Sequence, residues 1–199
     1  MTLRLESPTL EGETVRLTPL TRDGLPEVMR TILSAPEVFQ HIPFDLRVQS
    51  NVECLLEDAL SAQLEGTRVP FTTRLRMSGK LVGSTSLYLT NPTVPTVEIG
   101  FTWILPAWQR TAVNTEAKLL QLRHCFDVIG CQRVELKTDI LNQRSRAAIA
   151  RLGAREEGVL RAHMRRADGS LRDTVMFSIL ASEWPETRER LEQRLRSAR

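Results

Sequence analysis

A chain of 199 residues, 41% of them hydrophobic, is long enough to form one domain with a buried core. No apolar run approaches the ~18 residues that a membrane span needs, and residues 1–12, with Arg4 and Glu6, lack the apolar segment of a signal peptide. The formal net charge of +3 does not by itself indicate a nucleic-acid partner. We expect one domain over residues 1–199, located in the cytoplasm and not in a membrane.

The cysteines and histidines show no metal-binding pattern. Cys54, Cys125 and Cys131 are an odd number without metal-ligand spacing, and the sequence contains no His-x-x-x-His pair. We therefore expect separate, reduced thiols and no metal site.

Hydrophobic periodicity and turn residues predict the elements of the first half of the chain. Ser78-Gly79-Lys80 and the segment 91–95 are typical of turns between antiparallel strands. In order, we expect a strand over 14–20, a helix capped by Thr21 or Asp23 and ended by Pro36, an aperiodic connection over 37–48, a helix capped by Ser50 or Asn51 and ended by Gly66, and strands over 69–77, 81–89 and 96–105.

The stretch from Trp103 to Phe126 is central to the chain. An apolar strand end is followed by the polar turn Gln109-Arg110-Thr111 and then by a helix with apolar residues at helical spacing. The first turn of a helix presents free N–H groups and the positive end of the helix dipole, so this order predicts an anion site. An ordinary strand-to-helix connection is the alternative. The turn lacks the glycines of a P-loop or a dinucleotide fingerprint.

The second half of the chain predicts a strand, a helix, a hairpin and a last helix. The whole pattern indicates a mixed α/β fold of the α+β type, with a central, mostly antiparallel sheet flanked by helices. The expected elements are a strand over 133–138, a helix over 142–152 ended by Gly153, strands over 154–164 and 171–180 around the turn 167–170, and a final helix capped by Ser182.

Three stretches resemble the GNAT superfamily of acetyl-CoA-dependent N-acyltransferases: Val97 to Lys118, Leu141 to Arg161 and Asp168 to Trp184. The Asn-x-x-Ser element followed by Leu-Gly-Ala-x-x-Glu-Gly is similar to the ribosomal-protein N-terminal acetyltransferase (RimJ/RimL-like) branch. The resemblance implies a single domain with a core over about 10–181 and a C-terminal helix over about 182–196. It also implies acetyl-CoA as co-substrate and direct attack by an amine, either a protein N-terminal α-amine or a small amine.

Two features depart from the family pattern. The pyrophosphate turn of the family usually has small residues where this chain has Ala112 and Asn114; alanine disfavours a positive φ, and asparagine is bulkier. Many members also use a tyrosine near the second helix as general acid. The single tyrosine here, Tyr88, lies on an earlier strand, so we expect that acid to be missing.

The amine must lose a proton during the reaction, and we expect Glu98 to accept it, with Glu135 as second choice. The alternative for Glu98 is a strand glutamate facing solvent. Ser145 is the candidate donor to the departing thiolate; otherwise it makes only local helix bonds. Asn142 is expected to contact the pantetheine arm, to cap its helix, or both.

The remaining candidates follow from the expected path of CoA. We expect pantetheine to run along Trp103 and Ile104 as an added strand, and Arg146 is a weaker candidate for the adenosine phosphates. The acceptor pocket is expected to include Phe39, His41, Phe44 and Trp103, each of which is equally compatible with a core role. The expected pyrophosphate site comprises Gln109, Arg110, Thr111, Ala112, Val113, Asn114 and Thr115.

Two other functions remain open from the sequence. A non-catalytic acyl-CoA-binding or regulatory protein would explain the altered turn and the missing tyrosine. A nucleic-acid-binding module could use the arginines between Arg144 and Arg172, although acidic residues interrupt that run. Exposed sheet edges would also allow a homodimer.

Overall fold

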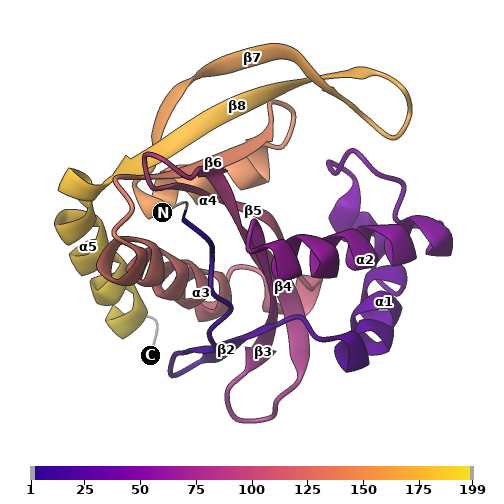
Figure 1. Ribbon diagram of the computed structural model, residues 1–199, viewed down its shortest axis with the longest axis horizontal. Helices are drawn as coiled ribbons and strands as arrows, with labels where there is room; N and C mark the ends of the chain where they lie inside the picture. Colours follow the sequence, from indigo (N-terminus) through magenta and orange to yellow (C-terminus); the bar gives the residue numbers. More distant parts are fainter. Residues whose placement is uncertain (1–2, 198–199) are drawn as a thin grey trace.

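One eight-stranded sheet runs through the molecule in the order β1-β2-β3-β4-β5-β6-β8-β7 (Figure 1). The computed structural model describes residues 3–197. Neighbouring strands are antiparallel except β5 and β6, which are parallel. The strands are β1 (Leu10–Glu11), β2 (Val15–Pro19), β3 (Arg68–Leu75), β4 (Leu81–Asn91), β5 (Thr96–Ile104), β6 (Arg133–Asp139), β7 (Arg155–Arg165) and β8 (Leu171–Leu180).

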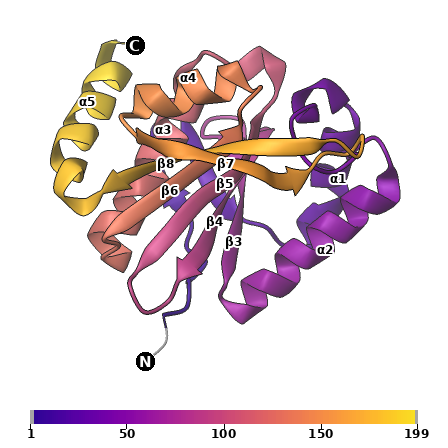
Figure 2. The same cartoon turned by 90° about the horizontal axis from the view of Figure 1, so that it is seen from above.

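Five α-helices cover the sheet, and two separate hydrophobic clusters show which face each helix covers. One cluster joins α1 and α2 to the sheet, and the other joins α3, α4 and α5 to it. In the view from above, α1 and α2 lie on the opposite side from α4 and α5 (Figure 2). The helices are α1 (Leu25–Leu33), α2 (Gln49–Glu65), α3 (Ala112–Arg123), α4 (Gln143–Leu152) and α5 (Trp184–Ser197).

The predicted mixed fold and the order of its main elements are confirmed. Glycines end α2 and α4 as expected, because Gly66 and Gly153 adopt the left-handed conformation with φ of 72° and 92°. The short strand β1 was not foreseen. It is only two residues long, which is too short for a periodic pattern.

Two predicted helix starts are wrong. The residue before α2 is Val48, not Ser50 or Asn51. The Asn51 amide instead donates to the Asp45 carbonyl at 3.0 Å and fastens the preceding loop. Ser182 lies inside a short 3-10 turn before α5, where the Glu183 carboxylate accepts from the Leu180 N–H at 2.9 Å.

The helix after the polar turn has an irregular end. α3 continues into a π-helical segment over His124–Ile129, and Gly130 closes it with φ of 74°. The segment packs on α5: the Phe126 and Trp184 rings are stacked with centroids 5.4 Å apart, and Trp184 Nε1 donates to Asp127 at 2.7 Å. α5 is therefore fixed to the α3 side of the sheet. No helix within residues 3–197 is long and apolar enough to cross a membrane.

Candidate active site

The sheet opens between its two parallel strands. β5 and β6 pair only from Thr96–Arg133 to Glu98–Glu135, so the rest of β5 has no β6 partner. On its other side β5 contains a bulge, because Phe101 and Thr102 together face Thr85 of β4. Phe101 has φ of 44°, an uncommon conformation for a bulky residue. Beyond Glu98, β5 therefore has a strand edge without a β6 partner.

Glu98 lies at the last paired position before this opening. It is 8% exposed, and its carboxylate contacts Lys137 Nζ of β6 at 2.9 Å. A Cβ atom on Gly100 would come within 2.6 Å of Glu98 Oε1, so the carboxylate covers the backbone of Gly100 on the α1–α2 face. The alternative of a glutamate facing solvent is therefore wrong.

Glu98 belongs to a polar row that crosses the sheet in register. Arg68 of β3 pairs with Tyr88 of β4, Tyr88 with Glu98, and Glu98 with Glu135. Glu135, the second candidate base, is held by Arg133 at 2.9 Å. The two carboxylates lie on the same face of the sheet, but Glu135 is tied to Arg133 of its own strand, while Glu98 contacts Lys137 of the neighbouring strand.

Tyr88 is the directly opposed neighbour of Glu98, although the sequence placed it on a strand remote from the chemistry. Burial raises the pKa of Tyr88, an effect that the positive charge of Arg68 opposes. The phenol consequently stays protonated at neutral pH and can donate a hydrogen bond on this face. Counting back from the turn at 91–95 does not reveal this pairing, because the register shifts between Leu89 and Asn91.

A second polar cluster lies where β6, β8 and the loop before α2 meet. The Asp139 carboxylate accepts from Arg166 at 2.8 and 3.0 Å and from the Leu141 N–H at 2.9 Å. Burial raises the pKa of Asp139, but these bonds outweigh it and leave the pKa below its usual value. Burial and the charges of nearby arginines lower the pKa of His41, which faces this cluster. Arg172 lies 4.0 Å from Asp139 and acts electrostatically on Glu98 as well.

The turn before α3 has the geometry of an anion site. Thr111 is the N-cap; its hydroxyl accepts from the Val113 N–H at 3.3 Å and donates to the Trp108 carbonyl at 2.8 Å. The left-handed residue is Arg110, with φ of 62°, and not Ala112, which is the first residue of α3. The expected conformational problem at Ala112 therefore does not exist. Asn114 and Thr115 are half-buried in the first turn of α3.

Gln109 connects this turn to two other elements. Its amide nitrogen donates to the Ile104 carbonyl at 2.8 Å, and its amide oxygen accepts from Arg144 of α4 at 2.9 Å. The end of β5 and the start of α4 are thus brought together, and Asn142 and Ser145 come to lie near the α3 turn.

Several candidate side chains are buried or make contacts within the protein. Trp103 and Ile104 are 3% and 7% exposed, so only their backbone can meet a pantetheine arm. The Asn142 oxygen accepts from the Ser145 N–H at 2.9 Å and caps α4. Ser145 is half-buried, and its hydroxyl makes no hydrogen bond to another described residue. Arg146 contacts Glu156 at 3.3 Å, so it is not free for adenosine phosphates.

The expected acceptor-pocket residues do not form one lining. Phe39 is buried and meets the Trp103 ring edge-on, with centroids 5.5 Å apart. Phe44 is half exposed, and His41 faces the Asp139 cluster. Phe39 and Trp103 therefore belong to the α1–α2 core, while His41 is half-buried outside that cluster.

Sequence reasoning missed three buried cations, namely Lys118, Arg68 and Arg172, of which Arg172 is 6% exposed beside Asp139. Lys118 of α3 is 4% exposed and donates to Thr85, Thr102 and Gln121 at 2.9, 2.7 and 3.1 Å. Arg68 is 8% exposed on the other face of the sheet. Arg68 shares its strand face with Thr72 and Arg74, and Lys118 shares its helix face with Asn114 and Gln121, so the sequence pattern contains no signal that either of these two cations is buried.

The sequence matches a known family of proteins over most of its length. Residues 14–155 match the family model described as the acetyltransferase (GNAT) domain. A Bacillus subtilis (strain 168) protein, YdaF, provisionally named a ribosomal N-acetyltransferase, is 30% identical over 110 residues, which cover 55% of this chain and 59% of that protein. The chain thus spans less than two thirds of that relative.

Two solved structures show the same fold. A GCN5-related N-acetyltransferase from Brucella melitensis is 30% identical with a TM-score of 0.87, and the match covers 98% of this chain and 88% of that one. Mycobacterium smegmatis RimJ, solved in complex with CoA-disulfide, is 24% identical with a TM-score of 0.78 over 94% of this chain and 93% of that one. Since the family model matches residues 14–155, well over half of the sequence, the chain belongs to the GNAT family of acetyltransferases.

Proposed function

We propose that this protein transfers the acetyl group of acetyl-CoA to a primary amine by direct attack. The observation that carries the proposal is the place of Glu98, a buried carboxylate at the last residue pair before β5 and β6 part. The acceptor is either a protein N-terminal α-amine, as the name of YdaF suggests for that relative, or a small amine. The free thiols of Cys54, Cys125 and Cys131 fit a cytoplasmic setting.

In this reaction the amine nitrogen attacks the thioester carbon, the C–S bond breaks, and the CoA thiolate departs. Glu98 accepts the proton that the amine loses, a role that requires hydrogen-bond reach from the nitrogen. Lys137, 2.9 Å from the carboxylate, holds Glu98 toward the α1–α2 face. Backbone N–H groups along the β5 edge are suited to stabilise the developing oxyanion.

The cofactor seat is supported by two parts of the chain. The N-terminus of α3, with Thr111 as cap and Arg110 exposed beside it, suits the pyrophosphate. The part of β5 beyond Glu98 has no β6 partner and suits a pantetheine arm bound as an added strand. GNAT proteins bind CoA in this fold, as the RimJ complex illustrates. The α3 turn and the open part of β5 are the groups that we propose to hold acetyl-CoA.

Ser145 is our candidate donor to the departing thiolate. Its hydroxyl is half-buried and makes no hydrogen bond to another described residue, and the Arg144–Gln109 bond keeps the start of α4 beside the α3 turn. A hydroxyl in that position can donate directly or relay a proton from water.

Thiol release from acetyl-CoA tests the proposal. Purified protein is mixed with acetyl-CoA and a panel of N-terminal peptides and small amines, and products are identified by mass. We expect thiol release only with an acceptor, matched by an equal amount of N-acetylated amine. Tight binding of acetyl-CoA without thiol release across the panel would support the non-catalytic alternative.

The nucleic-acid alternative has less support than the enzyme. Two arginines of the expected basic face are paired with carboxylates, Arg146 with Glu156 and Arg166 with Asp139, and Arg144 donates to Gln109. A cationic face whose members are already paired offers fewer charges to phosphates.

A further inference from the structure

Arg68 is a buried cation that makes no ion pair with a carboxylate among residues 3–197. Its Nε and Nη2 donate to the Ser86 hydroxyl at 3.1 and 3.0 Å, and its guanidinium carbon lies 4.8 Å from the Tyr88 ring centre and 5.7 Å from that of Phe101. Burial lowers the pKa of Arg68, and Asp58 of α2 acts on it only at longer range. A desolvated charge with neutral partners is costly to the fold, so its retention calls for another reason.

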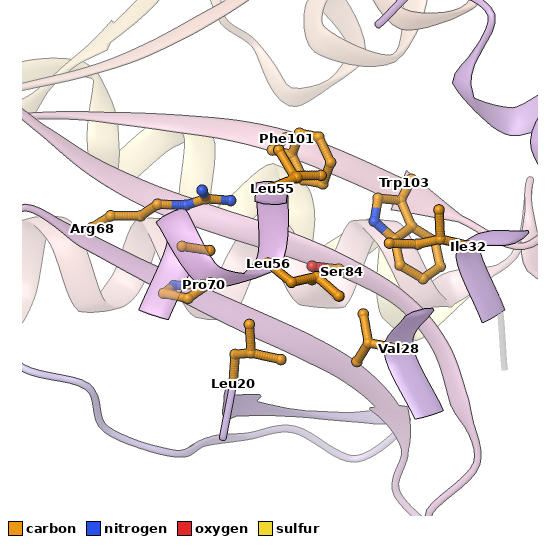
Figure 3. A pocket seen from close by; sticks show the side chains of 11 residues that line it. Leu20, Val28, Ile32, Leu55, Leu56, Arg68, Pro70, Ser84, Phe101 and Trp103 are labelled. Atoms are coloured by element: carbon orange, nitrogen blue, oxygen red, sulfur yellow. The ribbon is translucent and has the colours of Figure 1, made fainter. Parts of the chain in front are cut away.

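Arg68 lines a small cavity between the α1–α2 pair and the sheet (Figure 3). Trp103 and Ser84 are its other lining residues with polar side chains, and the rest of the lining is apolar. Trp103 is 3% exposed, and its indole Nε1 has no hydrogen-bond partner in the described part of the chain. In Figure 3 the guanidinium of Arg68 points toward Trp103, and the indole nitrogen lies on the side of the ring that faces Arg68.

The size and polarity of the cavity define what it can hold. Its volume is about 10 Å³, and a space of roughly 10–15 Å³ accommodates one water-sized group. The guanidinium of Arg68 and the indole N–H of Trp103 are donors without any acceptor capacity. The complementary group is therefore a single oxygen atom that accepts hydrogen bonds, and the positive charge favours an anionic one.

We infer that this cavity binds one carboxylate oxygen of the acceptor, so that the substrates of this enzyme are amines that also carry a carboxylate several bonds away. The inference rests on the proposed function and specifies its substrate class. Leu55, Ser84 and Phe101, which are half-buried, form the part of the lining that an acceptor can approach.

The sheet register sets the spacing between the two ends of the acceptor. Arg68 pairs with Tyr88, and Tyr88 pairs with Glu98. The backbones of Arg68 and Glu98 are therefore separated by two strand spacings, about 10 Å. This separation suits an acceptor whose amine and carboxylate are several bonds apart. A peptide with glutamate near its N-terminus fits, as does an amino acid with a distal amine.

Matched acceptors test the inference. The peptide pair is Ala-Glu-Ala-amide and Ala-Gln-Ala-amide; the small-molecule pair is lysine, acetylated on its distal amine, and cadaverine, which lacks the carboxylate. We expect kcat/KM for the carboxylate member of at least one pair to exceed that of its partner by about tenfold or more, because the neutral analogue leaves buried donors unpaired. Which pair shows the preference distinguishes a peptide from a small acceptor.

Variants assign the preference to the cavity. Arg68→Gln should reduce the ratio of kcat/KM between the two members of a pair to near one. Trp103→Phe should lower this ratio about threefold while keeping the ring that packs on Phe39. Arg151→Gln, on the exposed side of α4, is the control and should leave the ratio unchanged. A ratio near one in the natural enzyme, or a ratio that Arg68→Gln leaves intact, overturns the inference. Should Arg68→Gln not fold, Arg68→Lys, which keeps the charge and loses the planar fork, is expected to reduce the ratio by several-fold.

A binding measurement separates this inference from the proposed function. The same peptide and small-molecule pairs are titrated calorimetrically into protein saturated with desulfo-CoA, and the same preference for the carboxylate member is expected. Equal or absent binding of both members overturns the carboxylate site even if amines are acetylated. Preferential binding without thiol release from acetyl-CoA overturns the proposed function and leaves the site standing.

Discussion

Replacing Lys118 with methionine should stabilise the protein relative to the natural chain. The gain in the free energy of unfolding should be larger at neutral pH than at alkaline pH. Lys118 is 4% exposed, and its amine is held by three neutral oxygens of Thr85, Thr102 and Gln121. Burial lowers the pKa of Lys118 from 10.5 to about 7. Methionine has similar length and no charge, and the three neighbours keep bonds to one another at 2.8 and 3.1 Å.

The magnitude follows from this pKa. Between pH 7 and 10.5 the unfolded chain holds a proton on Lys118 that the folded chain lacks, so stability rises with pH across this window, by up to about 1.4 kcal/mol per pH unit. Below pH 7 the full destabilisation from burying the protonated amine, about 5 kcal/mol, is present. At pH 9 about 2 kcal/mol of this destabilisation remains. The advantage of methionine over lysine should therefore shrink by about 2 kcal/mol from pH 7 to pH 9.

Urea unfolding at pH 6, 7, 8 and 9, followed by circular dichroism, measures the difference in the free energy of unfolding between the two chains. Comparing variants cancels the titration of groups that do not interact with Lys118; the Cys125 thiol is the neighbour that does interact with it. Lys80→Met, at an exposed turn position, is the control and should show a small difference that does not change with pH. A Lys118→Met difference that is constant from pH 6 to 9, or that grows with pH, would show that the buried amine is not destabilised by burial.

Three further changes test the site. Glu98→Gln should lower kcat by about 10²–10⁴-fold and flatten the rising limb of the pH–rate profile; an unchanged profile in the thiol-release assay would remove Glu98 as base. Gly100→Ala places a Cβ 2.6 Å from Glu98 Oε1 and 3.1 Å from Tyr88 Cε2, so kcat should fall while calorimetry shows unchanged acetyl-CoA affinity; full activity would mean that the carboxylate position does not matter. Ser145→Ala should impair turnover more than acetyl-CoA affinity, and natural kinetics would return Ser145 to a structural role.

The sequence predicted the elements of this fold well because their apolar periodicity is strong and their ends have clear chemistry. Gly66 and Gly153 are examples, since only a left-handed residue closes those helices in this way. The prediction of Ser50 as the N-cap was wrong because serine also occurs within the first turn of helices. The start of α2 is instead set by the preceding loop, where the Asn51 amide is bonded to Asp45.

The candidate site was predictable only where local chemistry defines it. The α3 turn and Glu98 lie on one continuous stretch, so strand, turn and helix could be recognised together. Arg68 and Tyr88 reach Glu98 through the pairing of separate strands, and their proximity depends on register. The positive φ of Arg110 depends on how the turn enters α3, which residue type alone does not reveal.

The central claim is that the α3 turn and the open edge of β5 form a seat for acetyl-CoA. Calorimetric titration with acetyl-CoA, desulfo-CoA and ATP tests it directly. The account predicts tight binding of acetyl-CoA that is kept with desulfo-CoA and lost with ATP, because both the pyrophosphate and the pantetheine arm are bound. Absence of acetyl-CoA binding, or equal binding of ATP, would contradict it, because the opening between β5 and β6 would then not receive the pantetheine.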